Sequence, residues 1–283
     1  MKKNIIISGC DKAFFDFLKS ALDSLVALKL TTFADIAILD LGLENNQIQE
    51  IEKRGFLVKK PEWTMSIPKE NRREHQLGLV ARTVLRDYFP GYEVYLWFDA
   101  DAWAQTPEFF YALTDGARKF GAAVIFEDGT GYKKDFAYAK WWYGNMVAAY
   151  GFTKGLKIAL QPVINIGILA LSADAPHWDA WIKYYKLFIQ KRKKANNQHS
   201  FNAAVVLEKL PFYKAPARCN WITVLSDPVW NPQTKMLCEP NSELNPLSVI
   251  HLAGPNKGKI YDLYKTCGGK YQTPLTYEKI TSP

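Results

Sequence analysis

The segment YLWFDADAW, residues 95–103, restricts the fold of this chain more than any other feature, because an apolar strand ends there in two carboxylates. Side chains alternate along a strand, so Asp99 and Asp101 should point the same way at its carboxyl end, where open α/β sheets bind ligands. Two carboxylates can hold Mg²⁺ or Mn²⁺, with substrate phosphates supplying further oxygen ligands. A solvated turn is the alternative, since Asp is common in turns. The segment therefore predicts an α/β sheet with a metal site or a polar turn at its edge.

The composition indicates a folded, positively charged protein. The chain has 283 residues, of which 48% are hydrophobic and 14% aromatic, so it is too apolar for disorder and long enough for a full core. The net charge of +8 favours an anionic partner, such as a nucleotide phosphate, an acidic glycan or a lipid headgroup. Charge alone does not choose among these partners.

Several features predict a cytoplasmic protein. The four cysteines lie far apart without a C-x-x-C pair, which favours reduced thiols. The first apolar run ends near residue 8, too early for a secretory signal, and no stretch approaches the roughly 20 apolar residues of a membrane span. Peripheral association with the inner face of a membrane stays open. The basic run at residues 191–194 fits a solvated helix end or a contact with an anionic membrane or glycan.

Strand-like and helix-like patterns alternate along the chain, as is typical of α/β proteins. Short apolar runs predict strands at residues 4–8, 35–40, 56–58, 95–98, 122–126 and 163–171. Helical spacing predicts helices at residues 14–25, 77–88, 141–150 and 178–194, and a polar helix that ends near residue 54. Loops and small strands should follow at residues 210–252. We expect a Rossmann-like mixed sheet flanked by helices in a single domain, residues 1–260, with a polar, loosely ordered tail at residues 261–283.

Common phosphate-binding and hydrolase motifs are absent from the sequence. It contains neither G-x-G-x-x-G nor G-x-x-x-x-G-K-[ST], which removes the usual dinucleotide and P-loop signatures. It also lacks H-E-x-x-H and G-x-S-x-G, the commonest signatures of zinc proteases and serine hydrolases. A phosphatase of the haloacid dehalogenase type would have Thr or Val where Trp103 stands. The Asp pair is therefore the strongest functional signal.

A second polar motif, SVIHLAGPNK, occupies residues 248–257 near the other end of the chain. A short apolar strand there ends in His251, Gly254 permits a tight turn, and Lys257 can bring an ammonium group to a phosphate. An isolated histidine is more often a hydrogen-bonded structural residue than a metal ligand. The presence of the Asp pair makes the metal-ligand interpretation of His251 the stronger one.

Taken together, these motifs resemble those of the family 8 glycosyltransferases, which include bacterial lipopolysaccharide galactosyl- and glucosyltransferases and glycogenin. The D-x-D and H-x-x-G-x-x-K motifs both match, and Arg82 lies seventeen residues before the first Asp, as in the family. The N-x-G motif matches Asn165 and Gly167, and the helix start D-Q-x-x-x-N matches at Gln198 and Asn202. The resemblance spans most of the chain.

The resemblance implies a GT-A fold and a UDP-sugar donor, UDP-galactose or UDP-glucose, bound with Mn²⁺ or Mg²⁺ and transferred with retention of anomeric configuration. It implies a glycan or lipid-linked saccharide as acceptor, in lipopolysaccharide or cell-surface polysaccharide synthesis, and no nucleic-acid partner. It implies that the metal ligands are Asp99, Asp101 and His251. It implies catalytic roles for Arg82, Asn197 and Gln198. It implies nucleotide-sugar binding by Ser8, Asp11, Arg82, Asp99, Ala100, Asn165, Gly167, Gln198, Gly254 and Lys257.

The sequence departs from the family pattern at three places. Asn197 stands where the family has an Asp beside the reaction centre, Cys10 and Asp11 replace an acidic pair, and Gly258 and Lys259 replace Pro-Trp. These departures leave two alternatives to the glycosyltransferase. One is a catalytically silent GT-A module that binds a nucleotide sugar or a glycan. The other is a metal-dependent nucleotidyl or phosphoryl transferase that uses the same Asp pair.

Overall fold

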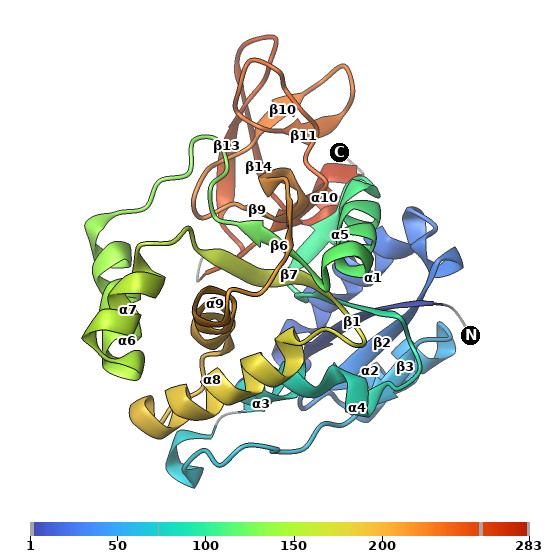
Figure 1. Ribbon diagram of the computed structural model, residues 1–283. Helices are drawn as coiled ribbons and strands as arrows, with labels where there is room; N and C mark the ends of the chain where they lie inside the picture. The colour runs from blue at the N-terminus through green and yellow to red at the C-terminus, as the bar shows by residue number, and fades with distance from the viewer. Residues whose placement is uncertain (1–2, 73, 255–256, 282–283) are drawn as a thin grey trace.

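The computed structural model describes residues 3–72, 74–254 and 257–281. Its centre is a seven-stranded sheet in the order β3-β2-β1-β4-β7-β6-β8 (Figure 1). Neighbouring strands are parallel except where β7 pairs with β4 and β6, so the sheet is mixed, as the sequence predicts. The strands are β1 (Asn4–Cys10), β2 (Ala34–Asp40), β3 (Leu57–Lys59), β4 (Val94–Phe98), β6 (Ala122–Phe126), β7 (Ile164–Ser172) and β8 (Tyr213–Ala215).

Helices cover both faces of this sheet. In β1, Ile6 packs in one apolar cluster and its neighbours Ile5 and Ile7 pack in another, because alternate side chains leave opposite faces. Burial on both faces explains why the central strands are continuous apolar runs. One face is covered by α1 (Phe15–Ala27), α2 (Asn45–Lys53) and α5 (Glu108–Phe120). The other is covered by α3 (Glu74–Ala81), α4 (Leu85–Tyr88), α8 (His177–Arg192) and α9 (Asn197–Glu208).

A small three-stranded sheet lies beside the main one. It contains β5 (Ala102–Ala104), β12 (Val249–His251) and β9 (Trp221–Ile222), in the order β5-β12-β9. The antiparallel pairing of β5 and β12 places His251 opposite Ala102. This register places residues 249–251, near the end of the chain, beside the segment that directly follows β4. Single 3-10 turns occur at Lys12–Phe14, Leu30–Thr32, Lys69–Asn71, Arg82–Val84 and Ala217–Asn220.

Between β6 and β7 the chain forms a helix pair, α6 (Phe136–Tyr150) and α7 (Phe152–Ala159), at the left of Figure 1. The pair packs against α8 and α9. Gly155 lets the two helices approach closely, because a Cβ atom there would lie 2.6 Å from the backbone nitrogen of Val147. In the part of the chain that the structure describes, each helix is too short or too polar to cross a membrane.

The polar C-terminal segment is ordered, so the expectation of a loose tail is wrong. Leu263, Leu275 and Ile280 are buried in an apolar cluster with Trp103, whose indole Nε1 donates to the carbonyl of Leu275 at 2.8 Å. The apolar side chains are few but alternate along a strand, and this spacing is enough to build one buried face. The region contains β10 (Val229–Asn231), β11 (Met236–Cys238), β13 (Ile260–Tyr264), β14 (Lys270–Pro274) and α10 (Tyr277–Thr281).

Candidate functional site

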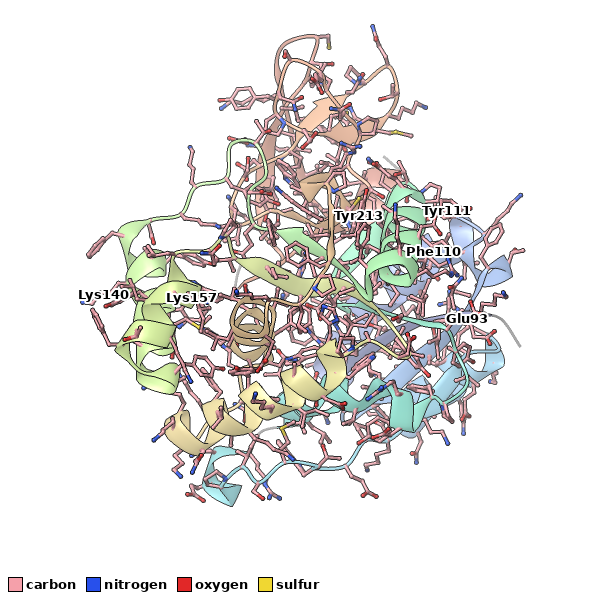
Figure 2. All side chains as sticks on the ribbon, viewed as in Figure 1. Glu93, Phe110, Tyr111, Lys140, Lys157 and Tyr213 are labelled. Atoms are coloured by element: carbon pink, nitrogen blue, oxygen red, sulfur yellow. The ribbon has the colours of Figure 1, made fainter. Side chains whose placement is uncertain are left out.

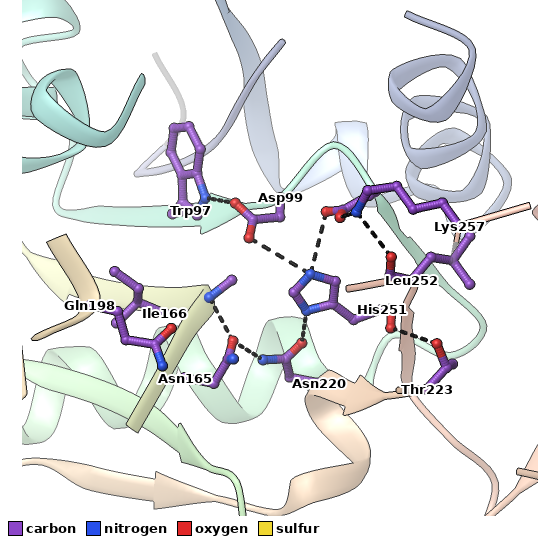
Figure 3. A network of polar contacts seen from close by, with 12 residues as sticks. Trp97, Asp99, Asn165, Ile166, Gln198, Asn220, Thr223, His251, Leu252 and Lys257 are labelled. Carbon is purple, nitrogen blue, oxygen red and sulfur yellow. Dashed lines mark hydrogen bonds and ion pairs between the residues drawn. The ribbon is translucent and has the colours of Figure 1, made fainter. Parts of the chain in front are cut away.

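Asp99, Asp101 and His251 converge, as the sequence predicts. Their ligand atoms all lie within 4.8 Å of one another, and the Nε2 atom of His251 lies 3.7 Å from Asp99 Oδ2 and 3.3 Å from Asp101 Oδ1. Figure 3 shows the side chains of Asp99 and His251 facing each other. The sequence predicted that the two carboxylates point the same way because side chains alternate along a strand, and this reason is wrong. β4 ends at Phe98, and the carboxylates meet because a turn follows, in which the amide of Ala102 donates to the carbonyl of Asp99 at 3.1 Å.

The pairing of β5 with β12 explains why a histidine so distant in sequence reaches the carboxylates. β5 starts directly after Asp101, and His251 ends β12 opposite the first residue of β5. The amide of Leu252 then donates to the carbonyl of Asp101 at 2.9 Å and continues the pairing by one residue. His251 is 4% exposed, so the imidazole is fixed among buried atoms.

A chain of side-chain amides orients His251. Asn220 Nδ2 donates a hydrogen bond to Asn165 Oδ1 at 2.9 Å, so the amide oxygen of Asn220 is the atom that faces His251. This oxygen lies 2.9 Å from His251 Nδ1 and accepts a hydrogen bond from it. The lone pair of Nε2 is then directed at the two carboxylates. Metal-bound histidines usually have their second nitrogen held in this way. Two carboxylate oxygens and an imidazole nitrogen therefore fit a divalent cation such as Mn²⁺ or Mg²⁺.

Arg82 and Trp97 hold Asp99 by one oxygen. Arg82 Nη2 donates to Asp99 Oδ1 at 2.7 Å, and Trp97 Nε1 donates to the same oxygen at 2.6 Å. The guanidinium carbon lies 4.1 Å from the centre of the Trp97 ring, and Arg82 Nη1 donates to the carbonyl of Ile166 at 3.0 Å. Because Oδ1 is occupied, Oδ2 is the oxygen that faces His251. Arg82 therefore forms its ion pair with Asp99.

Lys257 and His251 together control the charge of Asp101. Burial by itself would raise the pKa of the Asp101 carboxyl, but His251 and Lys257 lower it well below its usual range. Burial likewise lowers the pKa of His251, yet Asp101 and then Asp99 raise it above its ordinary value. Lys257 forms an ion pair with Asp101 and donates to the carbonyl of Leu252 at 3.0 Å. A bound cation would take the place of the proton that this cluster attracts.

Gly167 provides the space for this cluster. A Cβ atom at this position would lie 2.9 Å from both Asp99 Oδ2 and His251 Nδ1, closer than real Cβ atoms approach such neighbours. The carbonyl of Gly167 accepts from the amide of Asp99 at 2.8 Å, so the backbone of β7 directly borders the carboxylates. The glycine of the N-x-G motif is thus required by close packing around the cluster.

Two adjoining cavities hold most of the predicted site residues. The carboxylate pocket, of about 330 Å³, is lined by Arg82, Asp99, Asp101, Asn165, Gly167, Asn197, Gln198, His251 and Gly254, together with Leu79, Trp141, Ile166, Asn196 and Ala253. The β1 pocket, of about 340 Å³, is lined by Asp11, Ala100, Arg82, Asp99 and Asp101, together with Gly9, Cys10, Phe14, Leu41, Gly78, Leu79 and Trp97. Gly254 has a φ of 88°, a left-handed backbone conformation that favours glycine.

Some predicted residues have structural partners of their own. Among the described residues, Ser8 and Lys257 line neither of these two pockets, and Ser8 is buried in β1. Asp11 lies at the β1 pocket but also caps a 3-10 turn, where its Oδ1 accepts from the amide of Ala13 at 3.0 Å. The side chain of Asn197 donates to the carbonyl of Leu79 at 3.0 Å. These contacts fix where each side chain stands, whatever it binds.

Sequence reasoning missed Glu127, a carboxylate that is 7% exposed. Its Oε1 accepts from Asn165 Nδ2 at 3.0 Å and from Gln198 Nε2 at 3.3 Å, and its Oε2 accepts from the hydroxyl of Tyr138 at 2.6 Å. Glu127 therefore joins two predicted residues that are far apart in sequence. The signal was present, because Glu127 directly follows the apolar strand β6, just as Asp99 follows β4.

Glu127 also forms a wall of a third cavity, the aromatic pocket, of about 960 Å³. This pocket shares Trp141, Asn165, Gln198, Ala253 and Gly254 with the carboxylate pocket, so the two are continuous. Its remaining lining is Tyr132, Lys133, Lys134, Asp135, Tyr138, Ile222, Val224 and Leu225. A small charged ligand in the carboxylate pocket would therefore face a wider space with aromatic walls.

Neither a protein-family model nor a curated protein matches the chain. Solved structures do match. The galactosyltransferase LgtC, in complex with donor and acceptor sugar analogues, has a TM-score of 0.53 at 15% identity, over 89% of this chain and 87% of LgtC. An active-site mutant of LgtC matches with the same TM-score and identity, over 89% and 88% of the two chains. WbbM, a bifunctional glycosyltransferase in its apo form, has a TM-score of 0.53 at 12% identity, over 90% of this chain and 46% of WbbM.

The chain has the GT-A fold. The likeness extends over nearly the whole length of the chain, so the fold expected from the motifs is confirmed. In this GT-A fold, β1 connects to β2 on one side and β4 lies on its other side, so the strand order changes direction between β1 and β4. The β1 pocket, lined by Cys10 and Ala100, lies at the carboxyl ends of these two strands. Open α/β sheets bind ligands at such a point.

Proposed function

We propose that this protein is a metal-dependent glycosyltransferase that moves a hexose from a nucleotide sugar to a glycan or another acceptor. The observation that carries the proposal is the convergence of Asp99, Asp101 and His251 in the carboxylate pocket, which adjoins the β1 pocket at the change of strand order of a GT-A fold. LgtC, which has the same fold, was crystallised with donor and acceptor sugar analogues. A donor pocket joined to an acceptor pocket is what transfer between two sugars requires.

The donor would occupy the β1 pocket and the carboxylate pocket together. Asp11 and Ala100 line the part that would take the nucleoside, and Ser8 lies in the strand beneath it. Mn²⁺ or Mg²⁺, held by Asp99, Asp101 and His251, would stabilise the negative charge that develops on the departing diphosphate. Lys257, beside Asp101, supplies a further positive charge near the same group. Arg82 acts by holding the carboxylate of Asp99 in place.

The donor sugar would face Asn165, Asn197 and Gln198. Because Gln198 Nε2 donates to Glu127, the amide oxygen of Gln198 remains available to the sugar. The sugar acquires positive character as its bond to the diphosphate breaks, and an amide oxygen beside the anomeric carbon stabilises that charge. The backbone turn at Gly254 borders both this space and the aromatic pocket. The aromatic pocket would take the acceptor.

The finer assignments follow the motif resemblance. They are UDP-galactose or UDP-glucose as donor, retention of anomeric configuration, and an acceptor that is a glycan or lipid-linked saccharide of lipopolysaccharide or cell-surface polysaccharide synthesis. A cytoplasmic reaction fits the four cysteines, all of which are free thiols. In the retaining reaction that the resemblance implies, the departing phosphate oxygen would accept the proton of the acceptor hydroxyl, so no separate general base would be needed.

The test measures release of free nucleotide from a panel of nucleotide sugars with Mn²⁺ and with a chelator. We expect slow, Mn²⁺-dependent release of UDP in water and faster release with a saccharide acceptor. Asp99→Asn should reduce release at least about a thousandfold, because it weakens the metal site that stabilises the leaving group. Asp179→Asn, at an aspartate whose side chain is 88% exposed, is the matched control and should retain activity.

The same experiment separates the two alternatives. Asn197, in place of the family's Asp, favours a silent binding module as the second candidate. That module would be stabilised against heat by UDP-sugars and Mn²⁺ without any turnover. A nucleotidyl or phosphoryl transferase would release pyrophosphate or inorganic phosphate as its first product. Either outcome would overturn the glycosyltransferase proposal.

A further inference from the structure

Helix α6 presents an apolar face to solvent. Its sequence, FAYAKWWYGNMVAAY, contains one charged residue, Lys140. Trp142, Met146 and Ala149 form its buried side. Its exposed residues are Phe136, Ala137, Ala139, Lys140, Trp141, Tyr143, Gly144 and Ala148. A surface helix normally has a polar outer face, and a helix that is apolar all round is normally buried on every side. The outer face of α6 is therefore suited to contact with something less polar than water.

The neighbouring helix extends this apolar surface. Phe136 is 83% exposed and Trp141 is 45% exposed on α6, while Phe152 and Leu160, at the two ends of α7, are 65% and 73% exposed. Single exposed apolar residues are ordinary on a protein surface, but a group of them within one helix pair marks an interaction site. We call this surface the α6–α7 surface, defined by Phe136, Lys140, Trp141, Tyr143, Phe152, Lys154, Lys157 and Leu160.

The charge of the α6–α7 surface is strongly positive. Residues 133–157 contain five lysines and a single acidic residue, Asp135. That carboxylate is engaged as the cap of α6, where its Oδ1 accepts from the amide of Tyr138 at 2.7 Å. Lys134 pairs with Glu127 at 3.6 Å, whereas Lys140, Lys154 and Lys157 are exposed on the α6–α7 surface. Figure 2 shows Lys140 and Lys157 on the helix pair, on the side of the molecule away from Glu93.

The basic end of α8 adds to the same region. α8 packs against α6, and Arg192 Nη2 donates to Asn145 Oδ1 at 3.3 Å. This contact places the basic run at residues 191–194 beside the helix pair. Asn145 lies on the buried side of α6, so the basic run borders the helix pair without belonging to its exposed face.

We propose that the α6–α7 surface binds an anionic lipid bilayer. Aromatic and aliphatic side chains of a helix that lies flat enter the boundary between headgroups and acyl chains, and lysines beside them bind anionic headgroups. The stems of Lys140 and Lys157 can lie along the apolar layer while their ammonium groups reach the headgroups. A second copy of this chain is a poorer partner, because a symmetric contact would bring two sets of lysines together.

This surface leads directly to the proposed acceptor site. Trp141 belongs to the exposed face of α6 and also lines both the carboxylate pocket and the aromatic pocket. Tyr138, in the first turn of the same helix, and Lys133, in the segment that precedes it, line the aromatic pocket. If the proposed function holds, an acceptor anchored in the bilayer would meet the aromatic pocket at its mouth. That step rests on the proposed function, whereas membrane binding itself does not.

Sedimentation with vesicles tests the proposal. The full chain should bind vesicles of phosphatidylcholine mixed with phosphatidylglycerol, bind phosphatidylcholine alone far more weakly, and lose binding as salt is raised. The triple variant Phe136→Ser/Phe152→Ser/Leu160→Ser and the triple variant Lys140→Glu/Lys154→Glu/Lys157→Glu should each reduce partitioning about tenfold or more. Two variants are used so that one acts on the apolar contact and the other on the charge.

Matched controls lie on the opposite edge of the main sheet. Leu57 in β3 is 44% exposed, and Lys59 and Lys60 are exposed beside it, so Leu57→Ser and Lys59→Glu/Lys60→Glu change similar side chains at a distance. These controls should bind vesicles like the wild type. All variants should melt at the wild-type temperature and release UDP into water at the wild-type rate, since the changed side chains are exposed.

Three results would overturn the proposal. In the first, the wild-type protein binds neutral and anionic vesicles equally well. In the second, it binds neither kind of vesicle, and in the third, either triple variant binds anionic vesicles as strongly as the wild type does. A lipid-free dimer that the serine variant dissociates would show instead that a second copy covers the surface. Vesicle binding without any glycosyl transfer would leave the membrane surface supported and contradict the proposed function alone, so the two failures are distinguishable.

Discussion

The carboxylate pocket and the aromatic pocket share a wall but are built differently. In the carboxylate pocket, the charged side chains are held by several partners, and two of them, Asp99 and His251, stand at the ends of strands. The aromatic pocket is lined in part by α6, a helix inserted between two strands, and its aromatic and basic side chains reach the molecular surface. A preorganised charge site suits chemistry that every donor shares, whereas an open aromatic wall can vary with the acceptor.

Among the changes that compare the two pockets without replacing a metal ligand, the largest effect is expected in the carboxylate pocket, from Gly167→Ala. The added methyl group would collide with Asp99 and His251, so the three ligands could no longer converge. We expect the affinity for Mn²⁺ to fall about a hundredfold, which is the upper end of the losses usually seen when residues around metal ligands are changed. Activity should fall by a comparable factor. Calorimetric titration with Mn²⁺ and the UDP-release assay measure the two effects.

The matched control for this change is Gly144→Ala in α6. Nothing lies within 4 Å of the position that a Cβ atom would take there, so metal affinity and activity should stay at the wild-type level. Unchanged Mn²⁺ binding in Gly167→Ala would show that the ligands do not need the close approach of β7. The carboxylate pocket would then be no more rigid than its neighbour.

The shared wall should give an intermediate effect, through Glu127→Gln. A glutamine amide has one oxygen, so it cannot accept from Asn165, Gln198 and Tyr138 together, and at least one donor would lose its partner. An unpaired buried group costs about 1–3 kcal/mol, so the melting temperature should fall. Turnover should drop about tenfold or more as the amide of Gln198 loses its orientation, while Mn²⁺ affinity stays the same.

Glu208→Gln is the control for this change. Glu208 also accepts from a tyrosine and a lysine, Tyr184 at 2.8 Å and Lys183 at 2.6 Å, but it lies outside the pockets described above. It should alter activity little. Equal losses of turnover in the two variants would mean that Glu127 acts on stability alone and does not position Gln198.

The smallest effect is expected in the aromatic pocket, from Trp141→Ala. Stacking of a sugar on an aromatic ring is a modest interaction, so the KM for the acceptor should rise about three- to tenfold. Release of UDP into water should fall much less than transfer to the acceptor, because the metal ligands are untouched and Trp141 contributes only one side of the carboxylate pocket. Tyr143→Ala, on the same helix but outside the pocket lining, is the control. An equal loss of the acceptor-free reaction would show that the two pockets are not separable.

The sequence predicted most of the main sheet because its strands are buried on both faces and read as plain apolar runs. The strand expected at residues 4–8 is β1, and the one at residues 163–171 is β7 with small shifts at the ends. Among the described residues, the helices α5, α7 and α10 were not predicted, and α9 was expected only from the motif resemblance. α6 begins five residues before the expected position 141. The ordered C-terminal strands were missed because Leu263 and Leu275 are single apolar residues in polar surroundings, and only packing against Trp103 reveals their role.

The candidate site was predictable where motif order carries the geometry. The D-x-D and H-x-x-G-x-x-K motifs each end or follow a strand, so their meeting needed only the pairing of β5 with β12. The partners that orient the site were not predictable. Asn220 and Glu127 belong to no recognised sequence motif. Their roles follow from their contacts with His251 and Asn165, and only the folded structure shows these contacts. Lys257 was expected at a phosphate, and only the structure shows that it pairs with Asp101.

The most direct test of the account is anomalous diffraction from crystals grown with Mn²⁺ and UDP. We predict one strong Mn²⁺ peak between the carboxylates of Asp99 and Asp101 and the Nε2 atom of His251, with the diphosphate of UDP against the same ion. A Mn²⁺ peak elsewhere, or none at saturating Mn²⁺, would contradict the claim that these three side chains form a metal site.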